Sequence, residues 1–386
     1  EGGADAADRG LRRAALSDMV RSDSGAGFRI GADLRQDDGP VRLGTYMDSA
    51  NPGRRRVRIN GAENSATGLG EWLAVTWLTP AMDGLFTGPA ADRRRYMDRL
   101  ALALDPAHAS HAARYEAALR ERNRLLADRR EPEGAWLDAI EAQMVPHGAA
   151  LMRGRARLVE TLAVRLAEMP AEPFARPALT YAPGAPDHAD GLSQALFDNR
   201  ARDRAAQRTL AGPHRDELEV VHAAKRVPAA QSSTGEQKAM LVAITLAHAG
   251  LAAQGRAGLL LLDEVAAHLD PVRRAALFEQ LRGSGAQVWM TGTEAAPLGS
   301  RRQRGFDVVH RIIDQRRDPR RGRMDAIGQE HAAVFIDAVE PERHQRRVIL
   351  LRQIAIEAVE LLLVLAAVIG RRAHPHHQHR DTARAQ

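Results

Sequence analysis

The sequence predicts an α/β fold with an inserted helical domain, because three patterns succeed one another along its 386 residues. Residues 27–80 alternate apolar with polar side chains, residues 92–169 carry apolar side chains at helical spacing, and residues 240–290 alternate helix with strand. Strand, helix and strand at such short spacing imply parallel pairing in a doubly wound sheet.

The N-terminal pattern predicts several short strands. Alternating apolar pairs mark them: Phe28 and Ile30, Val41 and Leu43, Val57 and Ile59. The last pair leads into Asn60-Gly61, which is a strong hairpin signal. Residues 72–78 then form an apolar run that ends at Thr79-Pro80, as a buried strand does.

The middle of the chain predicts helices, followed by a link. Leu158, Leu162 and Leu166 repeat on one helical face within residues 92–169. Five prolines between residues 170 and 186 predict a loop-rich connection. After it we expect helices over 240–253 and 271–281 and strands over 259–262 and 287–290.

Composition and charge exclude some classes of protein. The chain has no cysteine, which excludes a disulfide scaffold, and no stretch of about twenty apolar residues is free of charge, so we expect no membrane contact. We expect a cytoplasmic protein. The 55 basic and 49 acidic residues give a net charge of +6, and the whole excess lies beyond residue 300. Since only Lys225 and Lys238 are lysines, arginine content reflects a general bias and is a weak sign of nucleic-acid binding.

The strongest local signal is Leu259-Leu260-Leu261-Leu262-Asp263-Glu264. An apolar strand that delivers two carboxylates at its C-terminal end suits a nucleotide site, where Asp263 holds Mg²⁺ and Glu264 polarises the attacking water. The alternative is a buried strand that ends in a solvated acidic turn.

A second signal lies about 25 residues upstream, at Ser232-Ser233-Thr234-Gly235-Glu236-Gln237-Lys238. Small hydroxyl and glycine residues at a helix N-terminus leave backbone N–H groups free for a phosphate. The alternative is an ordinary serine N-cap. Leu269-Asp270 follows the acidic pair by six residues.

These three elements resemble the signature, Walker B and D-loop motifs of ABC-type ATPases. Longer stretches resemble the RecF family of recombination mediators, in this order along the chain: Leu11 to Arg21, Trp77-Leu78-Thr79-Pro80, Gly88-Pro89, Arg93-Arg94-Arg95, Gly212-Pro213-His214-Arg215-Asp216, Gln231 to Ala239, and Leu262 to Asp270. The resemblance covers about residues 9–296.

The resemblance implies an ABC-type, SMC-like ATPase head that closes on DNA as an ATP-dependent homodimer. It implies residues 1–105 and 201–296 as the two parts of the head, 106–200 as a helical lid domain, and 297–386 as a tail of unassigned origin. Its cofactors are ATP and Mg²⁺, and its partners are single-stranded and gapped or junction DNA, RecR and RecO, in recombinase loading and the SOS response.

The resemblance implies the same roles for the acidic pair, with Asp263 as the Mg²⁺ ligand and Glu264 as the catalytic carboxylate. It also implies that Ser233 and Gly235 reach the γ-phosphate bound by the other protomer. Glu236 and Asp270 complete the expected cofactor-binding residues, and Asp270 communicates across the dimer interface. DNA contacts are expected at Arg93, Arg94, Arg95 and Arg215. A solvated helix face is the alternative for the three consecutive arginines.

The chain departs from the family pattern in two places. A Walker A loop, Gly-x-x-x-x-Gly-Lys-Ser/Thr, is absent from the 386 residues, and neither lysine has its context. The resemblance implies that this loop lies upstream of the first residue, so we expect weak nucleotide binding and leave enzyme activity open. A frameshift near Ala296 would explain the change of pattern in the tail. The alternatives are another SMC-like ATPase and a non-catalytic DNA-binding or interaction module.

Overall fold

The computed structural model describes residues 27–34, 39–48, 55–130, 132–170, 172–253, 256–266, 269–282, 284, 286–292, 307–309 and 333–336. The Leu11 to Arg21 segment lies outside the described residues, and so does most of the tail.

The N-terminal strands form one antiparallel sheet, as the alternating pattern predicts. Its order is β1 (Gly27–Leu34), β2 (Val41–Asp48), β3 (Arg55–Ile59) and β4 (Ala62–Asn64). Asn60 and Gly61 both take positive φ, 50° and 85°, as the tight β3–β4 turn requires. The predicted hairpin is therefore confirmed.

A second sheet carries the parallel strands. β5 (Leu73–Leu78), β9 (Ala257–Asp263) and β10 (Gln287–Gly292) run parallel, with β9 in the centre of the three. Two tail segments, β11 (Asp307–Val309) and β12 (Ala333–Ile336), extend this sheet antiparallel beyond β10. The predicted parallel pairing of the strands at 259–262 and 287–290 is therefore confirmed, and the antiparallel strands β11 and β12 are an addition that the sequence did not predict.

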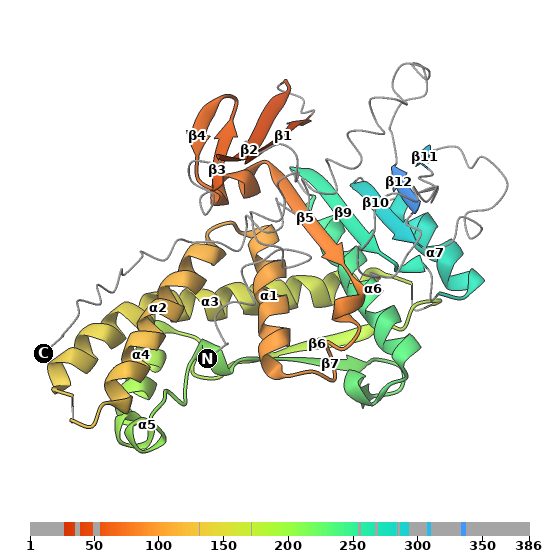
Figure 1. Ribbon diagram of the computed structural model, residues 1–386. Helices are drawn as coiled ribbons and strands as arrows, with labels where there is room; N and C mark the ends of the chain where they lie inside the picture. The colour runs from red at the N-terminus through yellow and green to blue at the C-terminus, as the bar shows by residue number, and fades with distance from the viewer. Residues whose placement is uncertain are drawn as a thin grey trace, which may run out of the picture.

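The parallel strands are buried on both faces, as strands covered by two layers must be. Leu259 and Leu261 pack toward the β1–β4 sheet, whereas Leu260 and Leu262 pack toward the helix α6 (Thr234–Ala252). Figure 1 shows β1–β4 above the parallel strands and α6 below them. The helix α7 (Pro271–Arg282) connects β9 to β10, in the strand–helix–strand order expected from the sequence.

Helices fill the predicted helical region and continue beyond it: α1 (Ala90–Leu104), α2 (His108–Ala127), α3 (Gly134–Glu168), α4 (Ala189–Asp198) and α5 (Arg200–Ala206). α3 has 35 residues, which at 1.5 Å per residue makes it about 50 Å long. Its N-terminal half shares a core with α2 and α4, and its C-terminal half packs into the core of α6 and the parallel sheet. α3 therefore joins the helical domain to the rest of the molecule (Figure 1).

The proline-rich link differs from expectation. It contains a strand, β6 (Pro177–Ala182), which pairs with β7 (Glu217–His222), and β7 pairs with the short β8 (Val227–Pro228). Four 3-10 turns complete the described elements: η2 (Thr67–Glu71), η3 (Pro80–Met82), η4 (Pro213–Arg215) and η5 (Ala229–Gln231). None of the helices in the described part of the chain is both long and apolar enough to cross a membrane.

Candidate nucleotide site and the loop beside it

The acidic pair lies at the carboxyl edge of the parallel sheet. Asp263 is the last residue of β9 and lies opposite Thr291 of β10, and Leu78 at the end of β5 lies opposite Leu262. All three strands therefore end at one edge, the place where open α/β sheets bind ligands.

Glu264 follows directly and takes the left-handed conformation, with φ of 53°. A non-glycine residue in that region costs about 1–3 kcal/mol and persists only where the surroundings hold it. Val265, the next residue, is 1% exposed and fixes the chain there. The sharp turn directs the chain away from the strand just after the two carboxylates.

The predicted signature segment forms the start of α6. Ser233 is the N-cap: its Oγ accepts a hydrogen bond from the Glu236 N–H, and the Glu236 Oε2 accepts one from the Ser233 N–H at 3.1 Å. Ser233, Thr234 and Gly235 are exposed. The backbone N–H groups of the first helical turn lack helical partners, so this end of α6 presents donors and a positive dipole to solvent.

Lys225 contributes a cation beside this helix start. Its Nζ lies 2.5 Å from the Glu236 Oε1, and this contact, with the Ser233 N–H, lowers the pKa of Glu236 to about 2. Lys238 is buried within α6, and its Nζ lies 3.5 Å from the Asp83 Oδ2. Both lysines of the chain are thus placed at α6.

Asp270 is positioned as the cap of α7. Its Oδ1 accepts hydrogen bonds from the backbone N–H groups of Val272 and Arg273, at 3.0 and 2.9 Å. The Arg273 N–H contact lowers the pKa of Asp270. The side chain remains about half exposed, so the cap does not remove it from solvent.

The residues present fit one part of a Mg²⁺–nucleotide site. Mg²⁺ in such sites takes one or two carboxylates and completes its shell with phosphates and water, which Asp263 satisfies. Ser232 supports a polar ligand at α6, because its buried Oγ finds no hydrogen-bond partner among the described residues. No group of three or more potential metal ligands occurs in the described ranges.

The three consecutive arginines have different surroundings. Arg93 is bidentate to Glu217, with Nε–Oε1 at 2.7 Å and Nη2–Oε2 at 3.0 Å, and its Nη1 donates to the Gly88 carbonyl. Arg94 donates to the Asp216 carbonyl at 2.9 Å. Arg95 is exposed and pairs with Asp92 of its own helix. Only Arg95 presents its guanidinium mainly to solvent, so a DNA role for Arg93 and Arg94 would require them to leave protein partners.

The Gly212-Pro213-His214-Arg215-Asp216 segment forms a tightly held loop. His214 donates from Nε2 to the Thr209 carbonyl at 2.9 Å, which leaves Nδ1 to accept from the Tyr115 hydroxyl at 2.9 Å. Burial lowers the pKa of His214 to about 4, so the ring is neutral at pH 7. Arg215 is exposed, and no ion pair is found for it in the described part of the chain.

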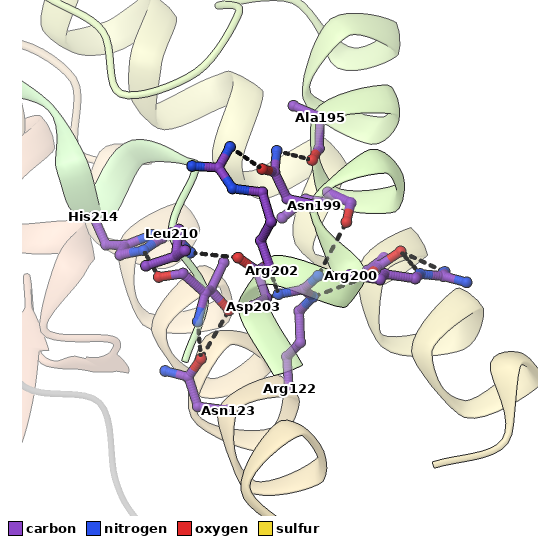
Figure 2. Close-up of polar contacts among 12 residues, drawn as sticks. Arg122, Asn123, Ala195, Asn199, Arg200, Arg202, Asp203, Leu210 and His214 are labelled. Carbon is purple, nitrogen blue, oxygen red and sulfur yellow. Dashed lines mark hydrogen bonds and ion pairs between the residues drawn. The ribbon is translucent and has the colours of Figure 1, made fainter. Parts of the chain in front are cut away.

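The helical domain anchors this loop through Thr209. Figure 2 shows Arg122 of α2 reaching Asp203 of α5, where its Nη1 lies 2.6 Å from Oδ2. The same Nη1 donates to the Thr209 hydroxyl, and Asn123 accepts from both the Thr209 N–H and hydroxyl. Arg122 is fully buried, so its contacts fix the loop and not a ligand.

Arg155 of α3 holds the other side of the loop and was not expected from the sequence. Its Nη1 donates to the Pro213 carbonyl at 2.6 Å and to the Asp216 Oδ2 at 2.7 Å. Its Nε and Nη2 contact both oxygens of Asp98, each at 2.8 Å. The available signal was a charged residue on the apolar face of a helix, one turn before Leu158 and two turns before Leu162.

Burial and pairing act against each other in this network. Burial raises the pKa of Asp98, but Arg155 and His108 outweigh it and hold that pKa below its usual range. For Asp216 burial dominates, and its pKa is raised although Arg155, Tyr181 and the Gly184 N–H all contact it.

The parallel sheet with its acidic edge, the capped helix α6 and the inserted helical domain define the head of an ABC-type ATPase. No family model matches the chain. The DNA replication and repair protein RecF of Mesorhizobium japonicum is 49% identical over 306 residues, covering 76% of this chain and 80% of that protein. RecF of Brucella suis is 48% identical over 302 residues, covering 75% and 78%. The chain therefore belongs to the RecF family of DNA replication and repair proteins.

Solved structures agree with the fold. "Structure of the recombination mediator protein RecF-ATPrS in RecFOR pathway" matches with a TM-score of 0.65 at 18% identity, covering 74% of this chain and 80% of that one. The corresponding RecF-ATP structure matches with a TM-score of 0.63 at 20% identity, covering 74% and 79%. The predicted ABC-type head is thereby confirmed.

Proposed function

We propose that this chain binds single-stranded and gapped or junction DNA in recombinational repair and the SOS response, in a manner that ATP and Mg²⁺ strengthen. The observation that carries the proposal is the Asp263-Glu264 pair at the carboxyl edge of the parallel sheet, in a chain of the RecF family. RecR and RecO are the proposed partners and the cytoplasm the proposed compartment.

Each site residue has a distinct proposed role. Asp263 holds Mg²⁺, which neutralises charge on the phosphates, and Glu264 orients a water molecule. Ser233 and Gly235 are exposed at the start of α6, so a second copy of the chain can bring its nucleotide to them. Asp270 and Glu236 keep α7 and α6 in shape beside that interface through their caps.

Nucleotide affinity of this chain is proposed to be weak. A phosphate-loop lysine reaches the β- and γ-phosphates directly. Here Lys225 is paired with Glu236, and Lys238 is buried beside Asp83, so neither replaces it. We therefore expect millimolar ATP to be needed for any effect.

The test is fluorescence anisotropy of labelled gapped DNA, with and without millimolar Mg-ATP. We expect ATP to tighten binding by the unchanged chain and not by Asp263→Asn, whereas Glu219→Gln, a matched change at an exposed strand position, behaves as the parent chain does. Glu264→Gln should keep the ATP effect, because it removes only the carboxylate that acts on water. DNA binding indifferent to ATP would favour the non-catalytic module, and absence of DNA binding would overturn the proposal.

A further inference from the structure

The outward face of the β1–β4 sheet carries a cluster of arginines. Register aligns Arg29, Tyr46 and Arg56 in one row across β1, β2 and β3. The next row holds Arg58 of β3 and Glu63 of β4. The alternate side chains of these strands, such as Leu43, Val57 and Ile59, pack inward against the parallel sheet, so the arginine face points away from it.

Three guanidinium groups gather around one aromatic ring. The Cζ atoms of Arg29, Arg56 and Arg58 lie 6.0, 5.4 and 5.0 Å from the centroid of the Tyr46 ring. Cation–π attraction holds each of them near the ring, but it contributes only about 0.5–1 kcal/mol at an exposed site. The three positive charges repel one another across the same small area.

One carboxylate offsets only part of this charge. The Glu63 Oε1 lies 2.9 Å from the Arg56 Nη2 and 3.1 Å from the Arg58 Nε, and it also accepts from the Tyr46 hydroxyl at 2.5 Å. Arg29 has no ion pair among the residues that the structure describes. The cluster thus keeps an excess of two positive charges, and the Arg56 and Arg58 side chains remain 46% and 52% exposed.

The shape of this face suits an extended anion. Gly31 and Gly44 lie in the same cross-strand row as Arg58, on β1 and β2. A Cβ atom built on either glycine would meet no atom closer than 3.7 Å. The surface beside the arginines is therefore low and open. Arg56 and Arg58 are two residues apart on one strand, about 7 Å, so their guanidinium groups can contact successive points along a charged chain.

We propose that this face, defined by Arg29, Tyr46, Arg56 and Arg58, binds the sugar–phosphate backbone of DNA. The inference rests on the proposed DNA-binding function and assigns it a surface separate from the nucleotide site and from Arg93, Arg94, Arg95 and Arg215. Phosphates would neutralise the excess charge that Glu63 leaves, and the exposed guanidinium groups provide charge-assisted donors. The contact reads no base sequence.

The test compares the salt dependence of DNA binding in two charge-matched variants. One replaces Arg29, Arg56 and Arg58 by Gln; the control replaces Arg120, Arg124 and Arg165, exposed arginines on α2 and α3 that pair with glutamates of their own helices. Each lost phosphate contact reduces the slope of log K against log salt by about 0.9 on duplex DNA, so three reduce it by about 2.7. The advantage of the unchanged chain over the face variant should then fall about 40-fold between 50 and 200 mM salt.

The outcomes separate this inference from the proposed function. If the unchanged chain binds DNA and both triple variants show the same salt dependence as the unchanged chain, the arginine face is not a DNA contact. An acidic protein would then be the remaining candidate partner for the face. If the unchanged chain does not bind DNA, the proposed function fails first. Arg29→Gln alone guards against misfolding, since the Arg29 side chain has no hydrogen bond in the described part of the chain; this variant should lower the slope by about 0.9 with an unchanged melting temperature.

Discussion

Replacing Arg155 by Met should destabilise the protein by about 3 kcal/mol at neutral pH. Arg155 is 4% exposed and is the shared partner of Asp98 and Asp216. Breaking a buried ion pair by removing one partner costs about 3–5 kcal/mol, because a charge is left uncompensated. The lower end applies here, since Asp98 is 27% exposed and keeps its 2.8 Å contact with the His108 Nε2.

The loss should depend on pH in a definite direction. The pKa of Asp216 is already raised by burial, and removing Arg155 raises it further. A carboxyl with a raised folded-state pKa favours folding while protonated, and this contribution is lost as pH rises through that pKa. The pKa of Asp98 is lowered, so its contribution is present above its unfolded pKa and is lost as pH falls through the folded pKa. The Asp216 effect makes the difference between the two proteins larger at pH 8 than at pH 5, whereas the Asp98 contribution changes only below its ordinary pKa of 3.8 and is the same at both pH values.

Urea unfolding followed by circular dichroism at pH 5 and pH 8 measures both quantities. Arg157→Met is the matched control, because Arg157 is exposed two residues further along the same helix and should change stability by less than about 0.5 kcal/mol. Arg155→Lys should lose less than Arg155→Met, since it keeps the charge but not the two-pronged contact with Asp98. A loss below about 1 kcal/mol, or one larger at pH 5 than at pH 8, would refute the account of this network.

Two further substitutions test the backbone conformation at Gly212 and the N-cap of helix α6. Gly212→Ala should lower the melting temperature, because Gly212 has φ of 131° and an added Cβ would lie 2.5 Å from the Tyr115 hydroxyl; an unchanged melting temperature would contradict this. Ser233→Ala should cost about 1 kcal/mol of stability through loss of the N-cap, whereas Ser233→Asp should keep the cap and place a negative charge where the phosphate is proposed to bind. If ATP strengthens DNA binding equally in Ser233→Asp and in the unchanged chain, Ser233 does not take part in nucleotide binding.

Local signals account for what the sequence predicted well. The Asn60-Gly61 turn and the leucine run of β9 each depend on residues adjacent in the chain, and the structure has both. It also has the Ser233 cap, which the sequence offered as the alternative to a phosphate site. β6 escaped prediction because its proline-flanked sequence is typical of a loop. It becomes a strand by pairing with β7, where Leu179 lies opposite Val220.

Whether a charged side chain is free for a ligand depends on partners that lie far away in the sequence. A short motif does not reveal those partners. The Arg93 run is equally consistent with a DNA contact, a solvated helix face or a buried pair. The deciding partner, Glu217, lies 124 residues further along the chain. The acidic pair was easier to interpret, because a strand end fixes where Asp263 lies whatever the rest of the chain does.

The Gly212 to Asp216 loop shows that a family motif can be mainly architectural. Four of its five residues have a structural requirement: Gly212 its positive φ, Pro213 and Asp216 their contacts with Arg155, and His214 its bonds to Tyr115 and Thr209. Arg215 alone presents an exposed side chain. Because α2 and α3 hold both sides of the loop, a movement of the helical domain would displace Arg215. The loop is also joined to α1, because Arg94 donates to the Asp216 carbonyl and Arg155 links Asp216 to Asp98, so a DNA contact at Arg215 would bear on the helical domain and on α1 together.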